Sequence, residues 1–201
     1  MTTSTLPIIL ASSSPRRREL LDRLGLRFVV QPSAEDESVP AGTPPQAMVE
    51  LLAERKAKSV SRQHGQGLII GSDTIVVLDG EVLGKPRDAG DAFRMLSGLQ
   101  GRQHLVYTGV AVIDAGSGRT LVRSSMTEVW IKPLSASQIE GYIATGEPND
   151  KAGAYGIQGL GATLVQRIHG DYFTVVGLPV GLLSDMLAEF GIHVMELKPN
   201  Q

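Results

Sequence analysis

The chain opens with a pattern of apolar and polar positions that predicts a strand, a helix and a second strand. Residues 7–11 form an apolar run typical of a buried strand, and residues 26–30 predict another short one. Between them, Ser14 has the side chain of a helix N-cap, and Pro15 suits the first helical position. Gly25 is expected to end this helix, whose leucines should face the core.

The middle of the chain predicts one long helix and one tight hairpin. Residues 46–63 have helical periodicity, and a buried strand at 68–70 is expected to end at residues 71–74. Asp79-Gly80 is a strong signal for a type I′ turn and predicts a hairpin over residues 75–83. The positions of the long helix expected to face inward are Met48, Leu51, Leu52, Ala53 and Val60.

Cap residues also mark the later helices. Asp88 is expected to cap a helix that reaches about Leu96, and Ser135 with Gln138 forms a capping box that opens a helix to about Thr145. The other predicted elements are a long hairpin of residues 104–114 and 120–132, strands at 163–168, 172–176 and 192–197, and a helix at 179–190.

Strands that alternate with helices and hairpins indicate an α/β fold with a mixed sheet. The 201 residues suffice for one substantial core or for two lobes that share a sheet, and we expect a single domain over residues 1–201. With 42% hydrophobic and 20% charged residues, the composition is typical of a soluble globular protein. The net charge of −2 gives no electrostatic reason to expect nucleic acid or a membrane as partner.

The absence of cysteine excludes disulfides, zinc–thiolate sites and thiol nucleophiles. It fits a reducing compartment, and the first residues lack the basic segment of a signal peptide, so we expect a cytoplasmic location. No window approaches the ~18–20 apolar residues of a membrane span. The four histidines do not have the spacing of metal ligands, which leaves no histidine-based metal site to consider.

Three consecutive arginines, Arg16 to Arg18, occupy the first turn of the first predicted helix. The helix dipole disfavours each positive charge there by roughly 0.3–1 kcal/mol. A bound phosphate would resolve this, held by backbone N–H groups, the hydroxyls of Ser12 and Ser14, and the guanidinium groups. The alternative is a helix with a solvated basic end.

Two further motifs offer a carboxylate and a cation. Asp73, flanked by Ser72 and Thr74, could bind a metal or take a proton from water, although it could equally be a turn residue. Lys85 in Gly84-Lys85-Pro86 could meet phosphate as a point charge, or could be a solvated loop lysine. Pro86 occupies the position where a P-loop needs a hydroxyl residue, so a P-loop is rejected.

Glycines are concentrated between residues 147 and 161, which suggests that backbone there approaches a ligand closely. Tyr155 could stack on a base and the Gln158 amide could contact a base edge, whereas the alternative is a loop whose Tyr155 belongs to the core. The acidic cluster Glu35-Asp36-Glu37 could supply oxygen ligands for Mg²⁺ or Mn²⁺, although such clusters are usually solvated.

Together these segments resemble the Maf family of nucleoside triphosphate pyrophosphatases, from about Leu6 to Pro179. The resemblance implies a bilobal α/β/α fold around a long, twisted mixed sheet, similar to inosine triphosphate pyrophosphatases, with the active site in the cleft between the lobes. The matching segments are residues 10–17, Asp36-Glu37, Lys56, Ser72-Asp73-Thr74, Gly84-Lys85-Pro86, the stretch from Glu147 to Gly159, and Gly177-Leu178-Pro179.

The resemblance further implies hydrolysis between the α- and β-phosphates, with Asp73 as general base and a divalent cation, Mg²⁺ or Mn²⁺, held by Glu37 and Asp73. One branch of the family acts on dTTP and UTP, and Arg16, Thr74 and Gln158 match that branch. A homodimer is one possible assembly. The residues expected to bind substrate are Ser12, Ser14, Arg16, Arg17, Lys56, Thr74, Lys85, Glu147, Asp150, Lys151, Tyr155 and Gln158.

Two other functions stay open at this point. The chain could be a Maf-type pyrophosphatase for modified nucleotides such as 7-methyl-GTP, or a nucleotide-binding regulator of cell division without catalysis. Ser13 stands where relatives in that family often have a small residue or glycine, and we expect this departure to be harmless. A Nudix hydrolase is disfavoured because the chain contains no Glu-Glu pair.

Overall fold

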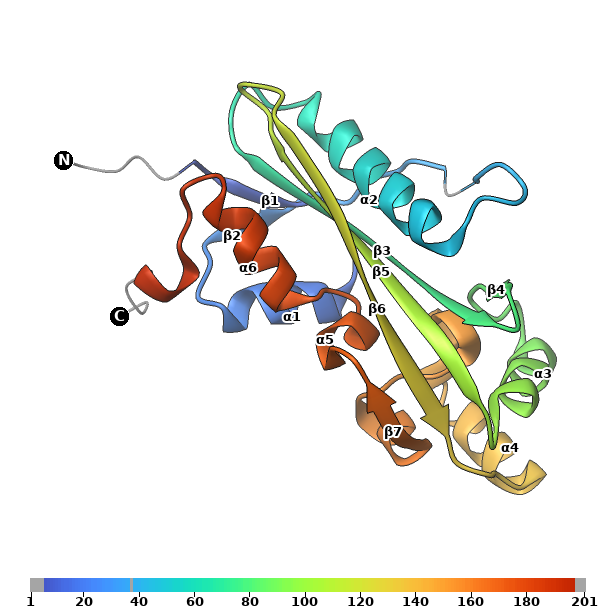
Figure 1. Cartoon of the computed structure of the whole chain (residues 1–201). Helices are drawn as coiled ribbons and strands as arrows, with labels where there is room; N and C mark the ends of the chain where they lie inside the picture. The colour runs from blue at the N-terminus through green and yellow to red at the C-terminus, as the bar shows by residue number, and fades with distance from the viewer. Residues whose placement is uncertain (1–5, 37, 198–201) are drawn as a thin grey trace. The chain divides into compact units, whose positions relative to one another are not determined.

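The apolar runs of the sequence form a seven-stranded mixed sheet in the computed structural model, which describes residues 6–36 and 38–197. Its order is β2-β1-β3-β5-β6-β7, with β4 paired to β3 (Figure 1). β1 is parallel to β2 and β3, while β4 and β7 are antiparallel to β3 and β6. The strands are β1 (Ile8–Leu10), β2 (Phe28–Val30), β3 (Leu68–Leu78), β4 (Glu81–Leu83), β5 (Gln103–Asp114), β6 (Thr120–Ile131) and β7 (Val165–His169). The expected α/β class with a mixed sheet is confirmed.

The predicted helix caps are also confirmed. Ser14, Asp88 and Ser135 each accept a backbone N–H of the first turn, and Gln138 completes the capping box. Among the described residues, no helix has both the length and the apolar character needed to cross a bilayer. The helices are α1 (Pro15–Arg23), α2 (Pro45–Ser61), α3 (Ala89–Leu99), α4 (Ala136–Ala144), α5 (Tyr172–Val176) and α6 (Val180–Ala188), with 3₁₀ turns η1 (Glu147–Asp150), η2 (Ala152–Ala154), η3 (Gly159–Thr163) and η4 (Val194–Glu196).

The chain forms two compact units, and β3, β5 and β6 contribute residues to both. Unit 1 comprises the described residues of Met1–Asp73, Thr108–Ser124 and Gly177–Gln201, and unit 2 comprises Thr74–Tyr107 and Ser125–Val176. In unit 1, α2 covers one face of the strands and α1 and α6 lie on the other (Figure 1). The α2 side is lined by small residues, so this helix lies close to the sheet; its core residues are Ile9, Ala11, Ala53, Ala57, Val60, Ile69, Ala111 and Ile113.

Unit 2 has its own core between the ends of β3, β5 and β6 and the helices α3 and α4, which contact each other. Side chains from the glycine-rich segment enter this core: Ala154 is fully buried and Tyr155 is 4% exposed. The segment is therefore packed onto the sheet of unit 2 and is not a solvated loop.

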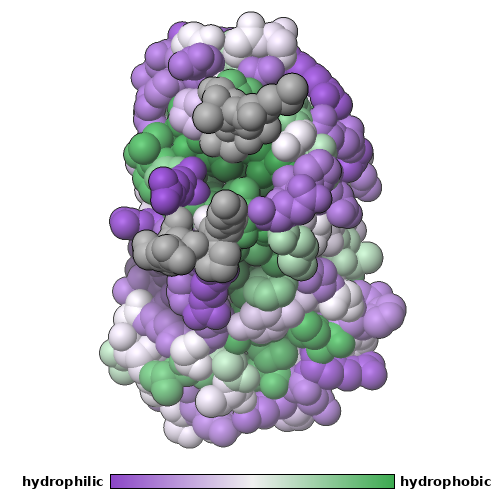
Figure 2. Space-filling model, turned by 90° about the vertical axis from the view of Figure 1, so that its left-hand side faces the viewer, coloured by the Kyte–Doolittle hydropathy of each residue, from purple (hydrophilic) through white to green (hydrophobic). Residues whose placement is uncertain are grey.

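The edge strand β2 exposes apolar side chains in unit 1. Val29 and Val30 of this terminal strand, which pairs with β1, are 58% and 41% exposed. Figure 2, a view from the left-hand side of Figure 1, shows hydrophobic residues gathered between polar ones on that face.

Two predicted strands are wrong. Residues 172–176 form α5, because the Asp171 carboxylate accepts the N–H and the hydroxyl of Thr174, at 2.8 and 2.9 Å, and so caps a helical turn. Residues 192–197 contain η4, because Gly191, with φ of 79°, turns the chain back so that the Ile192 N–H bonds to Leu187.

Two further predictions need smaller corrections. The buried face of α2 carries Val49 and Ala57, whereas Met48 and Leu51 are only half-buried. β3 does not end at residues 71–74, since it continues to Leu78. Asp73 is therefore held by strand backbone on both sides, and it is not a turn residue.

Candidate active site

The parallel pairing of β1 with β3 in unit 1 brings Ser12, beyond the end of β1, and Asp73, within β3, to the same part of the sheet. Leu10 of β1 is in register with Ile70 of β3, and the Ala11 N–H donates to the Ile70 carbonyl at 2.8 Å. Ser12 lies two residues beyond the end of β1, while Asp73 lies three residues beyond Ile70. The carboxyl end of β1, where α/β proteins commonly bind ligands, therefore lies beside the middle of β3.

A guanidinium group organises the turn between β1 and α1. Arg17 donates from Nε to the Gly177 carbonyl at 2.8 Å and from Nη1 to the Ser12 hydroxyl at 3.1 Å. The Ser14 N–H also donates to the Ser12 hydroxyl oxygen, at 3.2 Å. On β3, the fully buried Ser72 hydroxyl donates to the same Gly177 carbonyl at 3.1 Å. One network thus joins the turn after β1, strand β3 and the segment before α6.

The arginines at the start of α1 are partly compensated within the protein. Arg17 reaches back to Gly177 and Ser12, and Arg18 forms an exposed ion pair with Asp22 at 3.8 Å. Arg16 is half-buried. Long side chains find acceptors away from the helix end, so the sequence of this turn does not by itself require a bound anion. The cap by Ser14 is confirmed, at 3.5 Å from its hydroxyl oxygen to the Arg17 nitrogen.

Asp73 lies against α2, where it meets Lys56. Gly71 brings strand and helix together, since a Cβ at this position would stand 2.2 Å from the Ala53 carbonyl oxygen. Side chains alternate along a strand, so Asp73 points to the same side as Gly71. Lys56 Nζ lies 2.5 Å from Asp73 Oδ1, and the two side chains are only 14% and 11% exposed. The site therefore holds a largely buried carboxylate with a cation in direct contact.

The acidic segment predicted to bind metal is only partly described. Glu35 and Asp36 are exposed, and Asp36 accepts from the N–H and the hydroxyl of Ser38. Glu37 lies outside the described residues. Within residues 6–36 and 38–197, no three or more histidine or acidic side chains are grouped so as to hold a metal ion. The described residues therefore offer too few ligands to hold a metal ion by side chains alone. Mg²⁺, however, is commonly bound by one or two carboxylates together with the phosphates of a substrate.

In unit 2, the loop of Lys85 is attached to the glycine-rich segment. The Gly153 N–H donates to the Gly84 carbonyl at 3.0 Å, which places Lys85 beside that segment. Lys85 is exposed and makes no hydrogen bond or ion pair with the described residues. Gln158 is half-buried, and its side-chain amide likewise has no hydrogen-bond partner in the described part of the chain. Thr74, in β3, is half-buried.

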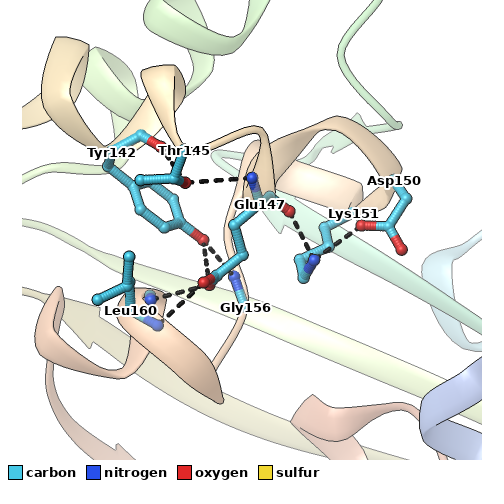
Figure 3. A network of polar contacts seen from close by, with 8 residues as sticks. Tyr142, Thr145, Glu147, Asp150, Lys151, Gly156 and Leu160 are labelled. Carbon is cyan, nitrogen blue, oxygen red and sulfur yellow. Dashed lines mark hydrogen bonds and ion pairs between the residues drawn. The ribbon is translucent and has the colours of Figure 1, made fainter.

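Glu147 and Lys151 bind protein groups (Figure 3). The Glu147 carboxylate accepts from Tyr142, Leu160 and Gly161, each at 2.9 Å. Lys151 donates to the Glu147 carbonyl oxygen at 2.5 Å and to the Asp150 carboxylate at 2.7 Å. The network organises the η1 and η3 turns.

The same network sets the charge of Glu147. Burial alone would raise the pKa of this carboxyl group, but the Gly161 N–H, the Tyr142 hydroxyl and the Leu160 N–H outweigh it. The pKa of Glu147 is therefore held below its ordinary value, and the group stays ionised at neutral pH.

Tyr155 is a core residue, which corrects the expectation that its ring is available to stack on a base. Its hydroxyl lies 2.7 Å from His104 Nε2, and the two rings meet edge to face with centroids 5.3 Å apart. Both side chains are buried, at 4% and 2% exposed. Burial raises the pKa of Tyr155 and lowers the pKa of His104 to about 4. A buried ring has no face to offer a base.

The buried His104 predicts a pH dependence of stability. In the unfolded chain its pKa returns to about 6.5, so the unfolded state binds more protons between pH 6.5 and 4 and the native state loses stability as the pH falls. We expect His104 to contribute a loss of about 2 kcal/mol in unfolding free energy between pH 7 and pH 5. Urea unfolding at both pH values checks this. His104→Phe should reduce the difference, and His169→Gln, at an exposed histidine, should not; equal pH dependence in wild type and His104→Phe would contradict the prediction.

Sequence reasoning missed several residues that shape both units. Gly177 belongs to a matched family segment, but its role as acceptor for Arg17, 160 positions earlier, was missed because no local pattern marks such a contact. His104 resembled an ordinary histidine, and Ser72 appeared only as a neighbour of Asp73. Tyr142 could have been found, because it lies in the last turn of a predicted helix, five residues before Glu147.

Several known proteins similar to this chain carry the name dTTP/UTP pyrophosphatase. A dTTP/UTP pyrophosphatase of Moorella thermoacetica is 56% identical over 187 residues, which cover 93% of this chain and 96% of that protein. Proteins of the same name from Desulforamulus reducens and Pelotomaculum thermopropionicum are 52% and 51% identical, with 94% of this chain and 99% and 98% of theirs covered. The solved structure of the Staphylococcus aureus Ham1 protein aligns with 79% of each chain at a TM-score of 0.47 and 15% identity.

A family model that matches most of the chain shows which family it belongs to. The family model described as Maf-like protein matches residues 7–190, which include both the Lys56–Asp73 pair and the glycine-rich segment. This chain belongs to the Maf family.

Proposed function

We propose that the protein hydrolyses dTTP and UTP to the nucleoside monophosphate and pyrophosphate. Water adds to the α-phosphorus, Asp73 takes its proton, and the bond from the α-phosphorus to the bridging oxygen breaks. Pyrophosphate leaves with the electron pair of that bond. The observation that carries the proposal is the 56% identity, over 93% of the chain, to a protein named dTTP/UTP pyrophosphatase.

The residues of unit 1 supply the chemistry that the reaction needs. Asp73 is positioned by strand backbone on both sides, and Lys56 beside it can stabilise negative charge that develops on phosphate oxygens. Ser12 offers a hydroxyl proton to phosphate, since Ser14 N–H and Arg17 occupy only its acceptor positions. We assign Ser12, Ser14, Arg16, Arg17 and Lys56 to the phosphates and Asp73 to the attacking water.

From unit 2 we assign Thr74, Lys85 and Gln158 to the substrate, on the family motifs that carry them. Lys85 and the Gln158 amide support this, because neither has a hydrogen-bond partner among the described residues. Glu147, Asp150, Lys151 and Tyr155 are better assigned to holding the segment in shape, since their polar atoms contact one another or protein neighbours.

A divalent cation fits the donor set if substrate oxygens complete its coordination. Asp73 supplies one carboxylate, and we propose Glu37 as the second on the family resemblance. Bound there, Mg²⁺ or Mn²⁺ would neutralise charge on the phosphates and orient the water. A cytoplasmic location and a single domain also remain proposals, supported by the lack of cysteine and by one family match over residues 7–190. The homodimer stays a prediction.

A panel of triphosphates tests the function. Pyrophosphate release from dTTP, UTP, GTP, ATP and 7-methyl-GTP would be measured with and without magnesium, using added inorganic pyrophosphatase and phosphate detection. We expect kcat/KM for dTTP and UTP to exceed the purine values by about 100-fold or more, with turnover dependent on the metal. A higher kcat/KM for 7-methyl-GTP would show that the enzyme acts on modified nucleotides instead of dTTP and UTP. Nucleotide binding without pyrophosphate release would indicate a regulator without catalysis.

A further inference from the structure

The polar network of Figure 3 binds backbone on both sides of Gln158, the residue of the glycine-rich segment that we assign to the substrate. Gln158 lies between Gly156 on one side and Leu160 and Gly161 on the other. The backbone N–H groups of these three flanking residues all donate to side chains of the network, at 3.2, 2.9 and 2.9 Å. The backbone is therefore tethered on both sides of Gln158.

The Glu147 carboxylate is the tether on the C-terminal side. Oε2 accepts from the Leu160 N–H and Oε1 accepts from the Gly161 N–H, so each oxygen orders one peptide group at the start of η3. Hydrogen bonds to an ionised acceptor are about twice as strong as neutral ones. The Glu147 carboxylate thus fixes the backbone of the residues that follow Gln158.

The Tyr142 hydroxyl joins the two sides. It donates to Glu147 Oε1 at 2.9 Å and accepts from the Gly156 N–H at 3.2 Å. A phenol has one proton to give and lone pairs to accept, so both bonds form together. Tyr142 is only 5% exposed, on the last turn of α4, and its ring cannot swing away without leaving the core of unit 2. One hydroxyl therefore couples the position of Gly156 to that of Gly161.

Glycine is required where the segment meets these side chains. A Cβ at Gly161 would stand 2.6 Å from the Tyr142 hydroxyl, 3.0 Å from Glu147 Oε1 and 2.2 Å from the Gly156 carbonyl oxygen. The backbone at Gly161 therefore packs directly against Gly156, Tyr142 and Glu147, and a larger residue does not fit at position 161. Such close packing leaves the segment little freedom to shift Gln158.

We infer that Tyr142 and Glu147 are positioning residues that set the Gln158 amide for recognition of the pyrimidine base. This inference rests on the proposed function. Gln158 makes no side-chain hydrogen bond with the described residues, so its own side chain does not fix it and the tethered backbone has to do so. A single amide can select one base over another only if it is held in the right place. If the amide is displaced, its donor and acceptor no longer form hydrogen bonds with the correct base.

The test compares dTTP with dCTP, whose bases differ in hydrogen-bond polarity at positions 3 and 4 and in the methyl group at position 5. Tyr142→Phe keeps the ring and removes both bonds of the hydroxyl. We expect the kcat/KM ratio of dTTP to dCTP to fall by about tenfold, through a higher KM for dTTP with kcat within about twofold of wild type. Glu147→Gln, which places an amide group against backbone N–H donors, should lower the ratio in the same direction.

A double-mutant cycle separates positioning from general structural damage. If Tyr142 acts through Gln158, then Tyr142→Phe added to Gln158→Ala should not change the ratio further. Tyr107→Phe, a half-buried tyrosine of β5 outside the network, is the matched control and should keep the wild-type ratio. Thermal melts of all variants report the fold.

Each result is decisive. An unchanged ratio in Tyr142→Phe and Glu147→Gln, with a lowered ratio in Gln158→Ala, would overturn the inference alone. The inference would also be overturned if Tyr142→Phe lowered the dTTP to dCTP ratio equally in the wild-type protein and in Gln158→Ala. The Tyr142 hydroxyl would then not act through Gln158. Absence of dTTP turnover in the unmodified protein would overturn the proposed function, and this inference with it.

Discussion

Asp73→Asn is expected to lower kcat for dTTP by about 10³-fold, because general-base catalysis contributes about 10²–10⁴-fold and the amide cannot accept the proton of water. KM should change much less than kcat, and the part that changes should come from the loss of one proposed metal ligand. The asparagine has nearly the same shape, and its side-chain oxygen can still accept from Lys56 at the position of Oδ1, so the binding groups keep their places. Steady-state kinetics with dTTP and magnesium, together with equilibrium binding of dTTP, separate the two effects.

The matched control for this change is Asp79→Asn. Asp79 lies in the turn between β3 and β4 with φ of 51°, a conformation that asparagine tolerates well, and its carboxylate pairs with exposed Arg102. Wild-type kinetics are expected for it. If Asp73→Asn retained most of the activity, Asp73 would not be the base, and if it lost dTTP binding as well, its role would be in binding.

Lys56→Met is expected to lower the unfolding free energy by about 3 kcal/mol, because it leaves the Asp73 carboxylate largely buried without its cation. Because methionine has nearly the length of lysine, the loss of unfolding free energy comes mainly from the missing charge and less from changed packing. Urea unfolding at pH 7 measures the change. The variant should also lose kcat/KM for dTTP, since Lys56 is assigned to the phosphates.

The neighbouring Lys58 provides the control, on the same helix and also paired to a carboxylate. Its Nζ lies 2.6 Å from Glu54, but the lysine side chain is 51% exposed, so Lys58→Met should cost less than about 1 kcal/mol. Combining Lys56→Met with Asp73→Asn should recover part of the lost stability, because no buried charge is then left unpaired. Equal losses in the two single lysine variants would show that burial does not strengthen the Lys56–Asp73 pair.

Much of the fold follows from patterns within a few residues of each other. Ser14 and Pro15 begin α1, Asp79 and Gly80 take the positive φ angles of the predicted turn, and Ser135 with Gln138 caps α4. These features depend on local hydrogen bonds and backbone preference, which the sequence carries directly. The two predicted strands at 172–176 and 192–197 were wrong, because the Asp171 cap and the turn at Gly191 produce helical turns there instead.

The residue chemistry of the candidate site was also visible in the linear chain: a carboxylate, several cations and an amide in motifs of one family. What each group faces depended on long-range packing. Lys56 meets Asp73 because Gly71 admits α2 to the sheet, Arg17 turns to Gly177, and Tyr155 is buried against His104. A side chain's partners come from segments far away in sequence, and burial decides whether they bind it more strongly than water does. Spacing along the chain therefore identifies the reactive groups, and packing separates those that hold the structure together from those left to meet a substrate.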